Sequence, residues 1–428
     1  MTSPVWAIAA REMKEHLRTL RLRLTLATTL VLVVLATLAG VINYRAQNEQ
    51  YEMALARAAE RLREATTWSE IQPKLVRPVA PLMILNAGFE AKEGRVTVAT
   101  IDQIPALMED SAVETPALSR FSGFDVTTVL IYLPGMLAIL LSFDAVSGEK
   151  ERGTLALELS NSITRWQLLS GKYLGGAFAL AFSLALSASA ALIVCLLGGV
   201  HFAANVWPRV ALWFVVLLAY LMAMFLAGLI ISVLTHRAAI SLLVGMLAWF
   251  LLVIFIPAAA ASAALQLRPT PSPYLLEADL ARLADELEAK YEEAQKQAGP
   301  MPPSDGVSVS IEQGVSASLF RAETYEWMVK YYALRARLDR EQAIRIFERT
   351  REYQEASRRQ SQLATDLAFL SPATQAEQLA NALTNTSRAD IYHFYDAARA
   401  YRQALLDFYD ANHIINSRRW ITDDPPDA

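Results

Sequence analysis

The stretch FDAVSGEKERGTLALELSNSITRWQLLSGK, residues 143–172, decides how the rest of the chain is arranged. It is polar and lies between two long apolar runs of sequence. Its charged side chains gather in its first half, at Asp144, Glu149, Lys150, Glu151 and Arg152. Each charge at the centre of a lipid bilayer costs about 3 kcal/mol or more. We therefore predict that residues 144–172 form a loop between two membrane-spanning helices.

Within this loop, two glycines and a series of apolar residues predict the local structure. We expect a turn at Gly148 and then a short charged segment. The spacing of Leu155, Leu159 and Ile163 predicts an amphipathic helix after it, because these residues recur near the helical period.

The overall composition agrees with a chain that lies partly in a membrane and partly in water. Hydrophobic residues make up 54% of the chain and charged residues 19%, and the mean hydropathy is +0.26. The net charge of −4 gives no basic surface for nucleic acid. Cys195 is the only cysteine, which excludes an intramolecular disulfide and disfavours a cysteine metal site. The sequence contains no HExxH zinc motif, and nothing in it indicates an enzyme.

Five apolar runs are long enough to cross about 30 Å of hydrocarbon. They are residues 24–42, 126–143, 173–197, 210–234 and 238–267. Pro134 predicts a kink in the second run, and Pro257 predicts a break near the outer end of the fifth. The third run is rich in Gly, Ala and Ser, which predicts close packing inside a helix bundle. The predicted fold class is therefore mainly α, a polytopic membrane protein with a large helical domain outside the membrane.

Two regions lie outside these runs. Residues 43–125 predict a small mixed domain, with a helix at 51–64 and a strand-like piece at 95–101. Residues 268–428 predict a helical domain with a linker at 299–306. Its expected helices are 274–297, a long helix at about 316–370 with an apolar seam at Phe320, Trp327 and Leu334, then 373–383 and 388–416.

Residues 1–23 form an amphipathic and basic segment before the first apolar run. Its apolar face includes Trp6, and its polar face includes Arg11, Lys14 and Arg18. Such a helix is expected to lie in the membrane interface, with its basic residues toward anionic lipid headgroups. A cleaved signal peptide is disfavoured, because the apolar run is too long and no small-x-small site closes it.

The short loops differ in their content of lysine and arginine, and this asymmetry predicts the orientation. Basic residues are concentrated in residues 1–23, in the loop 144–172 and at Arg237 in the turn 235–237, whereas the loop 198–209 has only Arg209. The rule that basic loops stay inside places the first three segments in the cytoplasm. Residues 43–125 and 268–428 are then expected outside.

The loop also resembles a known family. The run Ser147-Gly-Glu-Lys-Glu-Arg-Gly-Thr154, with the later Leu-x-Leu-x-Leu-Ser160 and Leu168-Leu-x-Gly-Lys172, is similar to the cytoplasmic loop of ABC-2 type transporter permeases. The resemblance implies that this loop touches a partner ATPase, through Glu149, Lys150, Glu151, Arg152, Gly153, Thr154 and Leu155. It also implies an interfacial elbow helix that includes Trp6, Arg11, Lys14 and Arg18, a bacterial inner-membrane location, and pairing with a second permease.

Residues 370–409 resemble, more weakly, the outer domain of the subgroup of these permeases with large extracytoplasmic loops. The family pattern has six spans, and we find no sixth apolar run after residue 267. We expect either a truncated sequence or five spans with the C-terminus outside.

The sequence also lacks an ATP-binding motif, and the functional hypotheses take this into account. There is no phosphate-binding loop, because Trp166 stands at the leading glycine position and Tyr173 where Ser or Thr is needed. We therefore expect no cofactor in this chain, ATP being bound by a separate subunit, and an ABC permease as its function. The alternative is a membrane-anchored sensor or scaffold whose outer domain binds a partner protein. An intramembrane enzyme is disfavoured, since no span carries paired carboxylates or histidines.

Overall fold

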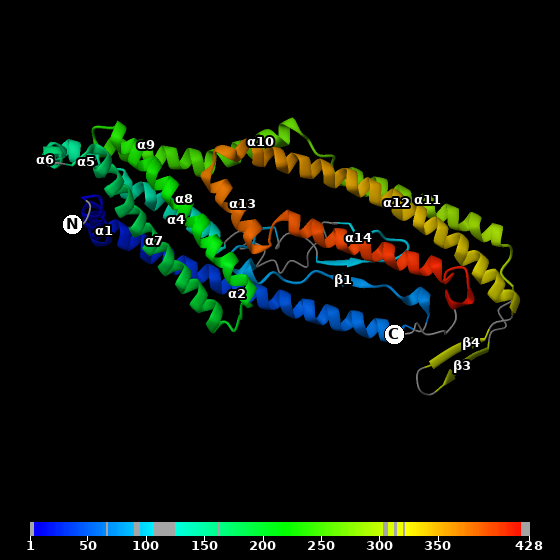
Figure 1. Ribbon diagram of the computed structural model, residues 1–428. Coiled ribbons are helices and arrows are strands. Elements are labelled where there is room, and N and C mark those ends of the chain that lie inside the picture. Colours follow the sequence, from blue (N-terminus) through cyan, green and yellow to red (C-terminus); the bar gives the residue numbers. More distant parts are fainter. Residues whose placement is uncertain are drawn as a thin grey trace.

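The computed structural model describes residues 4–65, 67–89, 95–106, 125–160, 163–302, 307–311, 315–319 and 322–420. The molecule is elongated, with a helix bundle at one end and a helical domain at the other (Figure 1). Five segments of the described chain are helical, long and apolar enough to cross a membrane. They are Leu20–Glu64, Val126–Arg152, Arg165–Leu197, Ala204–Leu234 and Ala238–Leu267. The predicted class, a multi-pass α-helical membrane protein, is confirmed.

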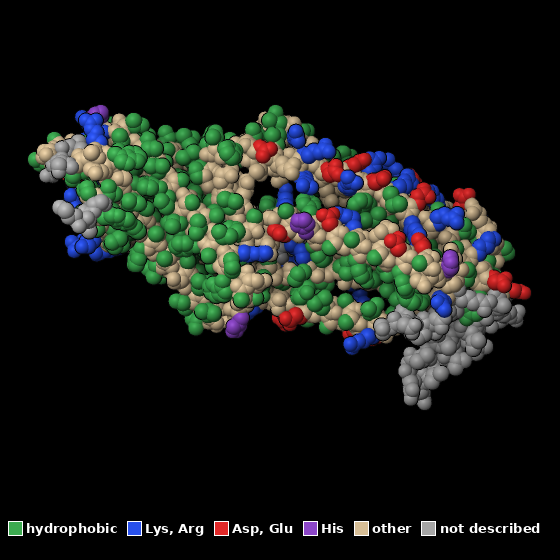
Figure 2. All heavy atoms as spheres, in the orientation of Figure 1, with side chains coloured by type: hydrophobic (Ala, Val, Ile, Leu, Met, Phe, Trp, Pro, Cys, Tyr) green, Lys and Arg blue, Asp and Glu red, His purple; other side chains and the backbone are tan. Residues whose placement is uncertain are grey.

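The bundle is built from helices that are apolar on nearly all sides. Its long members are α2 (Leu20–Glu64), α4 (Val126–Ser142), α7 (Arg165–Leu197), α8 (Trp207–Leu234), α9 (Ala238–Phe250) and α10 (Ile256–Leu267). Trp213, Phe225 and Leu180 are among the buried side chains of its core. Many other apolar side chains remain exposed on its outside, where hydrophobic atoms cover most of the visible surface (Figure 2). Such an outward apolar surface suits a lipid environment.

The helix of the first span continues past the residues where the sequence predicted its end. We expected residues 24–42, an end at Tyr44 and Arg45, and a second helix at 51–64. The structure has one continuous helix, α2, through Glu64. Polar residues end the apolar run but do not break the helix, because residues 43–64 contain no Gly or Pro and are rich in good helix formers.

The two prolines within spans are accommodated without ending a helix. Pro134 lies inside α4, and the hydroxyl of Tyr220 donates to the carbonyl of Ile131 at 2.9 Å, one turn earlier. The break predicted at Pro257 is wrong. The chain passes from α9 through a π-helical segment, Leu251–Phe255, directly into α10. Because proline has no N–H and its ring crowds the preceding turn, the wider π turn accommodates it.

The distal domain, as we call the described parts of 43–106 and 268–420 outside the bundle, is mostly helical. Helices α11 (Pro273–Ala298) and α12 (Ala322–Leu367) form a long hairpin, which α14 (Arg388–Ala411) accompanies (Figure 1). The predicted start of the long helix, near 316, is wrong. Residues of β4 (Val315–Leu319) pair with β3 (Val307–Ile311), because alternating Val and Ser favour a strand. Phe320 of the predicted seam lies outside the described residues, and α14 ends at Ala411 rather than 416.

The two outer segments pack against each other and against the bundle. Ile101 shares a core with Ala336, Leu406 and Tyr409. The short strands β1 (Lys74–Val76) and β2 (Val96–Val98) pair antiparallel. Helix α13 (Pro372–Thr384) returns to the bundle, where its buried alanines join the core of the spans. Single-turn helices complete the fold, at Trp68–Glu70, Pro81–Ile84, Ala204–Val206, Ala368–Leu370 and Arg418–Trp420.

Candidate functional site

The end of the bundle far from the distal domain collects most of the loops that the sequence predicted to be cytoplasmic. Helix α1 (Pro4–Arg18), the short helices α5 (Ser147–Arg152) and α6 (Thr154–Ser160), and the turn 235–237 meet there (Figure 1). We call this the basic end, because lysine and arginine atoms mark it on the surface (Figure 2). Its basic residues are Arg11, Lys14, Arg18, Arg21, Arg23, Lys150, Arg152, Arg165 and Arg237.

Helix α1 lies in a groove of α7 that two glycines create. A Cβ atom at Gly171 would come within 2.7 Å of Ile8, and one at Gly175 within 2.5 Å of the Cβ of Glu12. Two glycines four residues apart thus let the two helix backbones approach closely. Trp6 packs against Phe178 of α7, with ring centroids 5.9 Å apart. The elbow helix is therefore fixed to the third span.

A buried ion-pair cluster, Glu12–Lys172–Glu149, fastens this contact. The ammonium of Lys172 lies 2.7 Å from Glu12 Oε1 and 2.5 Å from Glu149 Oε1. The side chains of the three residues are 2%, 7% and 9% exposed, in the order Lys172, Glu12, Glu149. Buried charges must be paired, since an isolated one is strongly unfavourable. One lysine thereby joins α1, α5 and α7.

Two further ion pairs connect the same elements nearer the surface. Arg11 of α1 donates to Glu158 of α6 at 2.7 Å. Arg21, at the start of α2, donates to Asp144 at 3.0 Å and lies over the ring of Phe143. These contacts connect α2 and α6 to the elements that the buried cluster joins.

Helix α5 is also attached to the turn between α8 and α9. The ammonium of Lys150 donates to the carbonyls of Val233 and Thr235. Glu151 accepts a hydrogen bond from the first backbone N–H of α9, at Ala238, over 2.9 Å. A carboxylate is favourable at this position because it meets the positive end of the helix dipole. These contacts connect helix α5 to α7, α8 and α9, and through Lys172 to α1.

This geometry corrects the expected local structure of the loop. Gly148 lies inside α5, and the turn is at Gly153, which has φ +74° and closes the helix through bonds to Glu149 and Lys150. Glycine suits this left-handed position because it has no Cβ. Helix α6 ends at Ser160, so Ile163 is not part of it, and the side chain of Leu159 lies outside the described residues.

The predicted ATPase-contact residues separate into two groups. Glu149, Lys150 and Glu151 make contacts within the protein, as described above, although Glu151 is also exposed, and Leu155 is half-buried. Arg152, Gly153 and Thr154 are exposed. Two apolar side chains beyond the predicted set are also exposed at this end, Leu157 at 70% and Trp166 at 78%. Of the elbow residues, Lys14 and Arg18 are exposed, and Trp6 is 54% exposed.

Sequence reasoning missed the partners of the buried cluster. Glu12 and Lys172 are separated by most of the N-terminal half of the chain, so local periodicity did not join them. The available signal was Lys172 itself, a charge at the start of an apolar helix, which demands a partner. No group of three or more His, Cys, Asp or Glu able to hold a metal occurs among the described residues.

Comparison with known proteins gives the family. Residues 6–408 match the family described as ABC-2 family transporter protein. This chain belongs to that family. It is similar to a protein named probable ABC transporter permease protein NosY from Pseudomonas aeruginosa, 43% identical over 58 residues, 14% of this chain and 21% of the relative. The protein of the same name from Stutzerimonas stutzeri is 34% identical over 84 residues, 19% of this chain and 30% of the relative. The chain therefore matches less than a third of these relatives' lengths.

Proposed function

We propose that this protein is the permease subunit of an ABC transporter, which moves a substrate across the cytoplasmic membrane with ATP hydrolysed by a separate ATPase. Membership of the ABC-2 family and the five spans support the permease role. The observation that carries the proposal is the basic end, where a small exposed surface stands on a rigidly connected set of helices. We call Arg152, Leu157 and Trp166 the docking surface.

The docking surface suits a protein partner. Tryptophan and arginine are enriched at protein–protein interfaces, and this end of the bundle exposes Trp166 and Arg152 as well as Leu157. Helix α5 carries the adjoining Glu149, Lys150 and Glu151, which connect it to α1, α7, α8 and α9. A push on the docking surface would therefore move several helices together, as a rigid body, rather than bend a loop.

The orientation and the partners belong to the same proposal. The concentration of basic residues at this end supports a cytoplasmic location for it and an extracytoplasmic one for the distal domain. We infer a bacterial inner membrane as the location and a second permease copy as the partner within the membrane. Lysine and arginine residues of α1, Lys14 and Arg18, would face anionic lipid headgroups.

The test is co-purification of an ATPase with the intact chain from its native membrane in mild detergent. Leu157→Asp should abolish recovery of the ATPase, because it places a charge in the centre of the docking surface. The control is Leu62→Asp, since Leu62 is 54% exposed on the distal part of α2. Equal recovery with both variants, or no ATPase with the wild-type chain, would contradict the proposal.

A further inference from the structure

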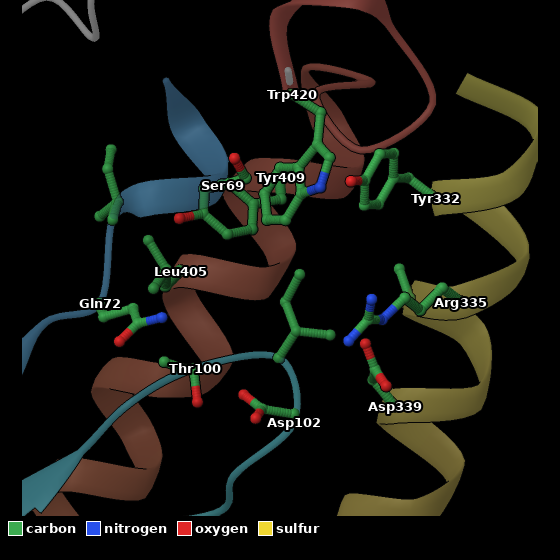
Figure 3. A pocket seen from close by; sticks show the side chains of 13 residues that line it. Ser69, Gln72, Thr100, Asp102, Tyr332, Arg335, Asp339, Leu405, Tyr409 and Trp420 are labelled. Carbon is green, nitrogen blue, oxygen red and sulfur yellow. The ribbon is translucent and has the colours of Figure 1, made fainter. Parts of the chain in front are cut away.

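Most large apolar side chains of the distal domain are at least partly covered. Around a cavity of about 270 Å³ inside this domain, for example, Leu405, Tyr409 and Trp420 line the walls and pack into one core (Figure 3). Among the described residues of 268–420, only four large apolar side chains are more than 60% exposed. We call them the junction patch: Tyr274 at 80%, Leu275 at 63%, Phe369 at 69% and Leu370 at 73%.

The junction patch lies where the distal domain meets the fifth span. Two of its residues are in the first turn of α11, and two are in the single-turn helix Ala368–Leu370 at the end of α12. Helix α12 runs back beside α10 (Figure 1), and the side chain of Gln360 donates to the backbone carbonyl of Arg268 at 2.6 Å. Residues 361–370 therefore lie alongside the span rather than beyond its end.

Helix α13, which directly follows the single-turn helix, fixes its depth. Ala373 in the first turn of α13 lines a small cavity together with Val253, and both belong to the same buried core. Val253 is near the middle of the fifth span, Ala238–Leu267. Because Leu370 precedes Ala373 by three residues, the chain can separate them by at most about 10 Å. The tip of α12 is thus held beside a segment that crosses the membrane.

The surface around the patch has the composition of a membrane boundary. Leu265 and Leu267 at the end of the span are 60% and 66% exposed. Figure 2 shows hydrophobic atoms projecting over the link between α10 and α11, with Lys and Arg atoms next to them. Arg268, which follows the span directly, is exposed. Tyrosine and arginine at the edge of an apolar surface are typical of residues at the headgroup level of a bilayer.

Lipid suits this surface better than a second copy of the chain. Pairing of two copies through the patch would bring the like charges of two Arg268 side chains to one apolar interface, where each would need a partner. A phospholipid offers acyl chains to the apolar side chains and a phosphate to the arginine.

We propose that the junction patch binds the lipid bilayer, and that the tip of α12 enters the leaflet on the side of the distal domain. Acyl chains would cover Phe369 and Leu370, while Tyr274 and Arg268 would lie among the headgroups. The distal domain is then anchored in the membrane at a second place, far along the chain from the fifth span. This anchoring involves no ATPase and does not depend on which side of the membrane is cytoplasmic.

Site-specific fluorescence of the full chain in phospholipid vesicles tests the proposal. Leu370→Cys, in a Cys195→Ala background, is labelled with the fluorophore NBD, whose emission shifts to the blue in an apolar environment. We expect blue-shifted emission, most of which is lost when the vesicles contain lipids with a nitroxide on their acyl chains. Glu348→Cys, exposed farther along α12 from the bundle, should show neither effect. Leu247→Cys, 55% exposed on the fifth span, provides the signal of a lipid-facing site.

The same label also tests the depth of the patch. Leu275→Cys should be quenched less than Leu370→Cys, because α11 begins after the span has ended. Quenching at 275 as strong as at 370 would contradict the assigned depth. Emission at 370 like that at 348 would overturn the proposal. Blue-shifted emission at 370 that nitroxide lipids do not quench would overturn it as well, since a protein such as a second copy would then cover the patch.

Discussion

Replacing Lys172 by methionine should reveal how strongly the buried cluster holds the basic end together. Lys172→Met keeps the length and apolar stem of the side chain but removes the only cation between Glu12 and Glu149. The side chains of these carboxylates are 7% and 9% exposed, so water cannot replace the ammonium. Removing one partner of a buried ion pair costs about 3–5 kcal/mol. We expect a loss of this size in the free energy of unfolding.

The triple variant Glu12→Met, Glu149→Met and Lys172→Met separates charge from packing. It removes all three charges and keeps the approximate shapes, so its stability should return to within about 1 kcal/mol of the wild type. Unfolding in mixed micelles, by titration with SDS and followed by tryptophan fluorescence, measures both differences. The reasoning fails if Lys172→Met costs less than about 1 kcal/mol, or if the triple variant is as unstable as the single one.

Three other predictions concern packing and protonation. Gly176→Ala should lower the free energy of unfolding by about 1–3 kcal/mol, because the new Cβ would lie 2.0 Å from the ring of Phe225. Adding Phe225→Leu should restore part of this loss, and wild-type stability of the single variant would contradict the prediction. Asn86→Ala should lower the free energy of unfolding by about 1–3 kcal/mol and speed hydrogen exchange in α13, since Asn86 donates a hydrogen bond to Asn381 at 2.7 Å. Unchanged hydrogen exchange in α13 would contradict this. Burial lowers the pKa of His16, so the unfolded chain binds a proton there more readily than the folded chain, and the melting temperature should fall as pH drops below about 6.5. His16→Gln should flatten this dependence. An equal slope of melting temperature against pH in both proteins would contradict the prediction.

The sequence predicts well what depends on composition and local pattern. The charges of residues 144–152 placed a loop between two spans, and the structure has helix ends there. Lysine and arginine patterns grouped α1, the loop and the turn 235–237, which meet at one end of the bundle. These signals are strong because membrane burial of a charge is so unfavourable.

Contacts between residues that are far apart in the sequence could not be predicted from local pattern. Glu149 looked like part of a charged surface, but its partner Lys172 is brought to it by the packing of α5 against α7. Replacing Glu149 by lysine would therefore damage the basic end itself, by like-charge repulsion with Lys172. Nor could local pattern show that Leu157 and Trp166, apolar residues in a helical series, would remain exposed.

The predicted helix boundaries were wrong where polar residues were taken to mark the end of a helix. At Arg45 the apolar run ends while the helix continues, because its propensity stays high. At residues 315–319 the opposite happened: a β-hairpin replaced the expected start of α12, which depends on pairing with β3.

Site-specific photocrosslinking tests most directly whether the docking surface meets an ATPase. A benzophenone amino acid in place of Trp166 should, on illumination of native membranes, form a covalent adduct that mass spectrometry identifies as an ATPase subunit. The same amino acid in place of Leu62, exposed on the distal part of α2, should form no such adduct. An ATPase adduct at position 62 but none at 166 would contradict the account.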